Sequence, residues 1–185
     1  AFNATVTPIP PTPPPAIATA GADLTANEKP DDAGDSQNPN PAVPQWRYGY
    51  RPQTTGTALT LFPPGDHTDN FIGANDPAEG FHIHGGASVP AVLVNTGTAP
   101  LTMNFGAGPL GPSEMLLHGD VNAPAVVRYT IPAAGTYDIS ASFRAIHSGD
   151  VDVHVVINGL PVFDQTLTAG QSAAASLSGR SLNSG

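Results

Sequence analysis

The clearest pattern in the chain is a strict alternation of hydrophobic and polar residues over residues 136–145. Five hydrophobic side chains alternate with five polar or charged ones: Tyr137, Ile139, Ala141, Phe143 and Ala145 against Thr136, Asp138, Ser140, Ser142 and Arg144. Residues 151–157 repeat this alternation after a Ser148-Gly149 turn. Successive side chains of an extended chain point to opposite faces, so both segments are predicted to be antiparallel strands with one solvated face.

A tight hairpin is predicted directly after the second of these strands. Asn158-Gly159 stands between residues 151–157 and 160–167, and this dipeptide suits a turn in which both central residues have positive φ. In the return strand Phe163 and Leu167 fall on the face opposite Val162. The return strand is therefore either buried on both faces or interrupted by a bulge.

Several shorter segments also have the composition of strands, and Gly and Pro separate them. These candidates are residues 46–50, 58–62, 81–84, 91–95, 101–105, 115–118 and 125–131. Residues 171–177 are rich in Ser and Ala and tolerate a helix, and no element is assigned to them. About eight to ten short strands joined by such turns predict an all-β fold, an antiparallel β-sandwich or jelly roll.

Residues 1–45 differ from the rest of the chain and predict an extended, Pro-rich N-terminal arm. Ten of the 21 prolines fall in this segment, which favours polyproline II, and the following residues 23–44 are polar and acidic. We expect this arm to dock on the sandwich or on a partner protein. The sandwich domain is expected to occupy residues 46–185.

The charge and composition exclude several classes of protein. Six basic residues stand against 15 acidic ones, for a net charge of −9, which leaves no basic face for a nucleic acid. The chain has no cysteine for a disulfide or thiol nucleophile, and no run of roughly 20 apolar residues to span a membrane. It begins without Met, as a processed export product does, so an extracytoplasmic location is expected.

Residues 126–159 read VVRYTIPAAGTYDISASFRAIHSGDVDVHVVING. Together with three shorter motifs, Asn38-Pro39-Asn40, Trp46-Arg47-Tyr48-Gly49-Tyr50 and Leu117-His118-Gly119, this block resembles a β-sandwich module of bacterial and planctomycete surface proteins, notably those with a PEP-CTERM sorting tail. The resemblance covers about residues 35–170. It departs from the module at Gly119, where the family usually has Pro.

The resemblance implies a galactose-binding-like or jelly-roll sandwich in an extracellular setting, with no established catalytic residues. The family pattern continues beyond the position of Gly185 with two more strands. We therefore expect a domain that lacks its last strands and has an open sheet edge. An open edge can pair with another chain, so protein partners are expected there and on residues 1–45, including further copies of the chain.

Three histidines form a candidate metal site. His82 and His84 flank Ile83 on a predicted strand and project from one face about 7 Å apart, and His118, beside Asp120, is a candidate third ligand. The alternative is that the histidines simply occupy the solvated face of their strand. We favour this alternative, because no Glu accompanies the histidines in their motif.

Loop carboxylates form a candidate calcium site. Asp66, Asp69 and Asp76, or alternatively residues 31–35 with three aspartates, offer the oxygen ligands that Ca²⁺ prefers. Neither cluster has the spacing of an EF-hand, and Asp is also an ordinary turn residue, so the interpretation as solvated turns is preferred.

Trp46, Tyr48 and Tyr50 alternate along one predicted strand and share one face. Exposed, they would form a platform for stacking sugar rings, whereas buried they would belong to the core. We favour the core, because only 6% of the residues are aromatic and the fold needs their buried area.

No motif for catalysis is evident in the sequence. There is no Gly-x-Ser-x-Gly elbow, and the carboxylates do not form a recognisable pair for glycoside hydrolysis. The sequence thus predicts a non-catalytic, extracytoplasmic subunit with a structural or assembly role. The alternatives are a carbohydrate-binding module and, third, a metal-dependent enzyme that uses the histidine cluster.

Overall fold

The structure is a computed structural model and describes residues 1–9, 18–19, 45–52, 58–63, 66–68, 71, 77–83, 89–103 and 108–185. All its regular elements are β-strands: β1 (Phe2–Ile9), β2 (Ala18–Thr19), β3 (Trp46–Tyr50), β4 (Thr60–Leu61), β5 (His67–Thr68), β6 (Ala78–His82), β7 (Ala91–Asn95), β8 (Met115–His118), β9 (Ala125–Tyr129), β10 (Gly135–Arg144), β11 (Val151–Ile157), β12 (Leu160–Leu167) and β13 (Ser172–Leu182). Among these residues no apolar helix of membrane-spanning length occurs.

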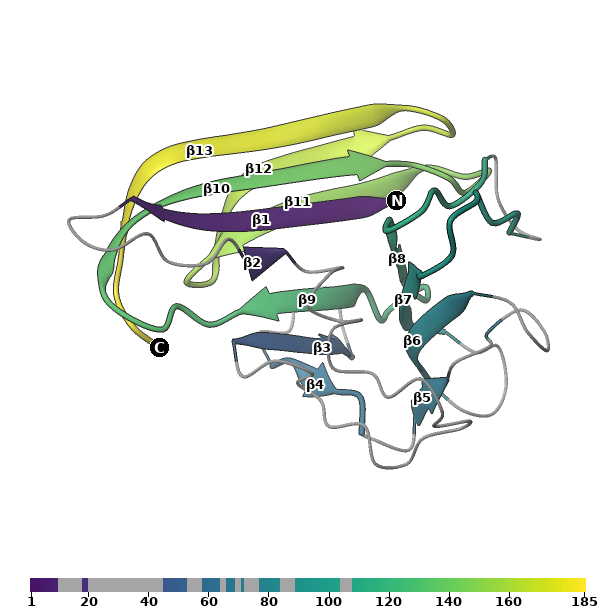
Figure 1. Ribbon diagram of the computed structural model, residues 1–185, viewed down its shortest axis with the longest axis horizontal. Coiled ribbons are helices and arrows are strands. Elements are labelled where there is room, and N and C mark those ends of the chain that lie inside the picture. The colour runs from purple at the N-terminus through teal and green to yellow at the C-terminus, as the bar shows by residue number, and fades with distance from the viewer. Residues whose placement is uncertain are drawn as a thin grey trace.

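The strands form three antiparallel sheets (Figure 1). The largest has eight strands in the order β13-β10-β1-β8-β7-β6-β5, with β2 paired to β1. A second sheet consists of β11 and β12, and a third of β4, β3 and β9. The prediction of an all-β, antiparallel fold is thus confirmed.

The strands with clear alternation lie where the sequence predicts them. β11 and β12 have the expected bounds, and Asn158 and Gly159 in the turn between them have φ values of 52° and 81°. Val155 pairs with Phe163 but Val156 pairs with Pro161, so Val162 has no residue opposite it. Of the two interpretations of the return strand, the bulge is confirmed.

Other predictions of single strands need correction. No element is predicted for residues 171–177, yet residues 172–177 lie within β13, the longest of the described strands. Of the predicted strand at residues 101–105, the described residues 101–103 contribute an isolated bridge between Leu101 and Leu110, and the predicted strand at 58–62 is reduced to the two residues of β4. Pairing with a neighbour decides these outcomes, because Ser and Ala have little strand preference of their own.

The predicted arm contributes strands to the main sheet. β1 pairs with β10 at eight positions, from Phe2 opposite Phe143 to Ile9 opposite Thr136. It lies between β10 and β8 in the interior of the sheet (Figure 1). The rest of the predicted arm, residues 10–17 and 20–44, lies outside the described residues.

Hydrophobic side chains form three clusters on the faces of the main sheet. One cluster packs this sheet against β3 and β9 and includes Tyr48, Phe81 and Val92. A second lies on the opposite face of β7 and β8. The third packs β10 and β13 against β11 and β12, with the Phe143 and Phe163 rings stacked at 5.8 Å between centroids.

Asn95 is a fully buried polar residue at the end of β7. Its Nδ2 donates to the carbonyl oxygens of Ala99 (2.9 Å) and Leu110 (3.0 Å), and its Oδ1 accepts from the Gly97 N–H (2.9 Å). The side-chain amide therefore satisfies main-chain groups at both ends of the connection between β7 and β8. Without these bonds the buried Leu110 carbonyl would lose a donor at a substantial cost.

We expect Asn95→Asp to lower the free energy of unfolding by about 3 kcal/mol at neutral pH, because a carboxylate would face the two carbonyl oxygens without a proton to donate. Urea unfolding measures this loss. Asn122→Asp makes the same change of charge at an exposed loop residue and should leave stability nearly unchanged. Equal stability of the two variants would contradict the role given to Asn95.

Candidate functional site

The structure brings two of the three predicted metal-ligating histidines onto one face of the main sheet. His82 in β6 and His118 in β8 both pair with Ala91 in β7, so they lie in one row across three strands. Their backbones are separated by two strand spacings, about 10 Å. His84 lies outside the described residues.

The local contacts of these histidines differ. The His82 ring is buried and lies edge-on to Phe71, with 5.1 Å between centroids. The His118 ring lies 6.0 Å from that of His147. Burial lowers the pKa of His118, the neighbouring His147 lowers it further, and Asp120 acts in the opposite direction. His118 therefore resists protonation because of where it is packed.

His147 is poorly arranged to complete a metal site with His118. Its Nδ1 accepts a hydrogen bond from the Gly149 N–H (3.0 Å), which places the proton of the neutral ring on Nε2. Within the described part of the chain, no three His, Asp or Glu side chains are grouped closely enough to hold a metal ion. His82 and His118 are thus packed against neighbouring rings and are at least partly buried.

The three aromatic residues proposed for stacking sugars belong to the core cluster of β3. Trp46 is 2% exposed and Tyr48 is 0% exposed, so neither ring offers a face to solvent. Tyr50 is half-buried and packs against Phe62 at 5.5 Å between ring centroids. This arrangement agrees with the preferred interpretation of the alternation in residues 46–50.

Of the residues predicted to bind calcium, the structure describes Asp66. Asp66 is half-buried at the start of the short segment that includes β5. Asp69 and Asp76, like residues 31–35 of the alternative cluster, lie outside the described residues.

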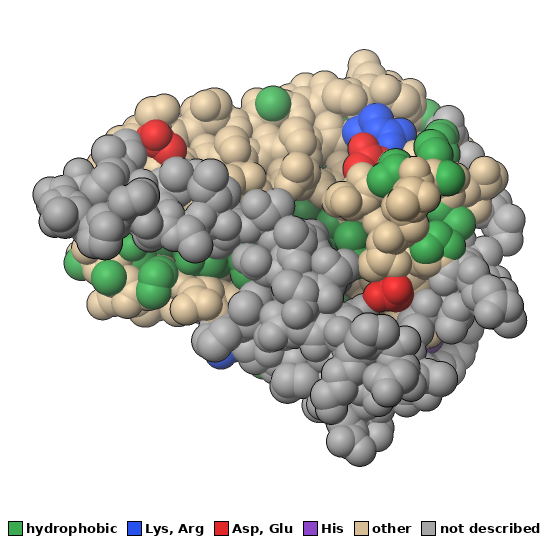
Figure 2. Space-filling model, viewed as in Figure 1, with side chains coloured by type: hydrophobic (Ala, Val, Ile, Leu, Met, Phe, Trp, Pro, Cys, Tyr) green, Lys and Arg blue, Asp and Glu red, His purple; other side chains and the backbone are tan. Residues whose placement is uncertain are grey.

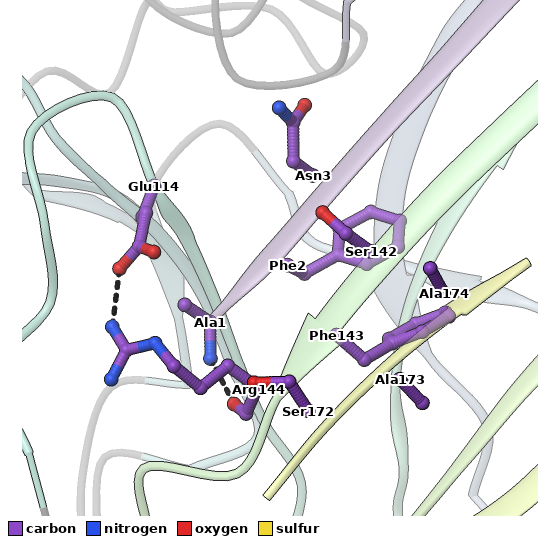
Figure 3. A pocket seen from close by; sticks show the side chains of 10 residues that line it. All are labelled: Ala1, Phe2, Asn3, Glu114, Ser142, Phe143, Arg144, Ser172, Ala173 and Ala174. Carbon is purple, nitrogen blue, oxygen red and sulfur yellow. Dashed lines mark hydrogen bonds and ion pairs between the residues drawn. The ribbon is translucent and has the colours of Figure 1, made fainter. Parts of the chain in front are cut away.

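An open depression of about 410 Å³ lies where β1, β10 and β13 come together at one end of the main sheet (Figure 3). Arg144 and Glu114 point toward each other at its rim, with 2.6 Å between Nη2 and Oε2. Figure 2 shows basic and acidic side chains next to each other on this face of the molecule. The same guanidinium donates to the Pro109 carbonyl at 2.8 Å.

The two charged side chains of this depression are already paired with each other. The Glu114 carboxylate accepts from Arg144 and from the Gly111 N–H (2.7 Å). Burial acts to raise the pKa of Glu114, but these two partners and the positive charge of the Ala1 amino group outweigh it and hold the pKa below its usual value of 4.5. The pair therefore ties the connection between β7 and β8 to the end of β10.

The chain matches no family model, no curated protein and no solved structure. The family named from the sequence motifs thus stays a prediction.

The outer edge of β13 is the remaining candidate. β13 is the last strand of the main sheet, and none of the described strands pairs with its outer side (Figure 1). The main-chain hydrogen bonds of β10 show which groups of β13 point to its outer side. The main-chain N–H of Arg144 donates to the Ala1 carbonyl at 2.8 Å, whereas that of Ala145 donates to the Gln171 carbonyl at 2.9 Å. Even-numbered residues of β10 therefore bond toward β1, and odd-numbered ones toward β13.

The register extends this rule to β13. Ala173, Ala175 and Leu177 stand opposite the odd-numbered residues of β10 and bond with them, because bonded and non-bonded pairs alternate. The N–H and C=O groups of Ser172, Ala174 and Ser176 consequently point away from the sheet. We call residues 172–177 the open edge. It ends at a bulge, where Gly179 has a φ of 65° and donates to Asp138 Oδ1 at 2.8 Å.

The sequence predicts an open sheet edge but not the strand that forms it, because no element is predicted for residues 171–177. A partial signal was present, since Ala173, Ala175 and Leu177 alternate with Ser172, Ala174 and Ser176. Side chains this small give a weak hydrophobic period, and only pairing with β10 makes the segment a strand.

We expect Glu114→Gln to lower stability modestly, by less than about 1 kcal/mol, because the ion pair is partly exposed. A carboxylate with a lowered pKa stabilises the fold above pH 4.5, and this contribution disappears as the pH falls through the lowered value. Thermal unfolding at several pH values should show the wild type and variant differing at pH 7 and converging in acid.

The control for this prediction is Asp150→Asn, which removes the same charge from an exposed loop residue. Its stability should follow the wild-type curve at every pH. A Glu114→Gln difference that is unchanged in acid would show that the carboxylate charge contributes nothing.

Proposed function

We propose that the chain is a non-catalytic, extracytoplasmic β-sandwich subunit that assembles through the open edge of β13. The single observation that carries this proposal is that residues 172–177 form a strand edge without Pro or charge. Unpaired N–H and C=O groups along a strand edge are a template for a further strand.

The other strands at the margins of the sheets have the features that prevent such pairing. β4 and β5 are two residues long, and β9 carries Arg128. β11 carries Asp152 and His154, and β12 carries Pro161 and Asp164. Proteins protect their edges by short strands, charges and proline. The contrast with residues 172–177 supports a pairing role for that one edge.

The layered packing supports the sandwich. β11 and β12 pack on the face of β10 and β13 through a cluster that includes Ala141, Phe143 and Leu167. The sheet of β4, β3 and β9 packs on the main sheet through a separate cluster. The extracytoplasmic location rests on the family resemblance, and the absence of cysteine is compatible with it.

The proposal predicts that the purified chain of 18.8 kDa forms a larger particle in solution. Ala174→Lys with Ser176→Lys places charges on two exposed positions of the open edge and should give a monomer. Light scattering over a range of protein concentrations measures the mass of each particle.

The control variant carries the same two added charges at exposed loop positions, Thr98→Lys and Val121→Lys. It should keep the mass of the native particle. A native chain that is monomeric at every concentration would overturn the proposed assembly role. A native particle whose mass does not respond to the edge lysines would place the interface elsewhere.

A further inference from the structure

The open edge has the properties required to pair with a copy of itself. The chain carries a net charge of −9, so two copies repel each other, and an uncharged contact surface avoids bringing like charges close together. None of residues 172–177 is ionisable. Along the upper margin of the molecule, where β13 runs, Figure 2 shows mainly uncharged side chains and backbone.

The side chains of the edge leave room for a second strand. Ala174 and Ser176 are exposed on one face, and Ala173 and Ala175 lie on the other. All four are small, so another strand can approach to the normal spacing of about 4.8 Å without a clash between long side chains.

The direction of the main-chain groups selects the register. Only even-numbered residues of the open edge offer N–H and C=O groups to a partner, so antiparallel self-pairing must place even residues opposite even residues. A register shifted by one residue would set the even-numbered residues of one copy opposite odd-numbered residues of the other copy, whose N–H and C=O groups are already bonded to β10. A twofold axis at Ala174 sets Ser172 of one copy opposite Ser176 of the other, and so uses all three bonding positions.

Two neighbouring registers also place even-numbered residues opposite even-numbered residues, but they use fewer of the three bonding positions. An axis at Ala175 would set Ser172 opposite Ser178, where the strand bulges before Gly179. An axis at Ala173 would set Ser176 opposite Gly170, which lies in the turn before β13 and donates its N–H to the Ala145 carbonyl at 2.9 Å.

We infer that the partner at the open edge is a second copy of this chain, paired β13 to β13 in antiparallel orientation about a twofold axis at Ala174. This inference rests on the proposed function and names its partner. The interface is isologous, so each copy contributes the same residues and the pairing closes at two chains. The two main sheets become one continuous sheet, joined by about six N–H···O bonds.

The test uses single cysteines, since the native chain has none. Ala174→Cys places the two thiols directly opposite each other, with Cα atoms about 5.5 Å apart, within the range of a disulfide. Mild oxidation of the full chain should convert most of it to a covalent dimer on non-reducing gels.

Ser176→Cys is the matched control, on the same strand face and likewise exposed. In the inferred register the two introduced cysteines, one in each chain, lie four residues apart along the strand. This separation of about 13 Å is too large for a disulfide. It should stay monomeric on the gel. A mixture of Ser172→Cys and Ser176→Cys chains should give a covalent heterodimer, because these positions face each other.

Ala174→Cys that fails to cross-link, or Ser176→Cys that cross-links equally well, would overturn the inferred register. The outcome also separates this inference from the proposed function. A particle that the edge lysines dissociate, but that Ala174→Cys does not link, would show that the edge assembles with another strand. Circular dichroism of each variant confirms that the compared chains are folded.

Discussion

The two-sided hydrogen bonding of β10 is the constraint on which the rest of the structure depends. Its even-numbered residues bond to β1 and its odd-numbered residues to β13. Its side chains also serve two clusters, Tyr137 in one and Ala141 and Phe143 in another. Because β10 determines which groups of β13 are already used, it also determines which groups remain on the outer side.

The connection between β7 and β8 is secured from two directions, by different physical means. Inside, the neutral amide of Asn95 satisfies buried carbonyl groups. Outside, the charged pair of Glu114 and Arg144 ties the same connection to the end of β10. The buried contact uses no charge, because desolvating one is costly, whereas the ion pair lies where solvent still reaches it.

The sequence was sufficient to predict those elements whose side chains differ strongly between the two faces. β10 and β11 were predictable because large hydrophobic residues alternate with polar ones, and β12 because the Asn158-Gly159 turn precedes it. β13 was not, since its Ser and Ala side chains give little contrast, and its pairing with β10 is a long-range property. β1 was hidden by the Pro-rich segment in which it stands.

In the candidate site too, some features follow from local sequence patterns and others depend on the order of the strands. Alternation in residues 46–50 was enough to place Trp46 and Tyr48 on one face, and the scarcity of aromatic residues in the chain favoured their burial. The meeting of His82 and His118 on either side of Ala91 requires the order of three strands, which no local pattern specifies. The open edge likewise depends on which strand comes last in the sheet.

The position of β1 has a consequence for how the chain folds. Phe2 pairs with Phe143, so one of the innermost pairings of the sheet joins residues that are far apart in the sequence. Such contacts require a long loop to close before they are formed, which slows folding. During synthesis the first strand has to wait until β10 has been made, and the main sheet can be completed only after that.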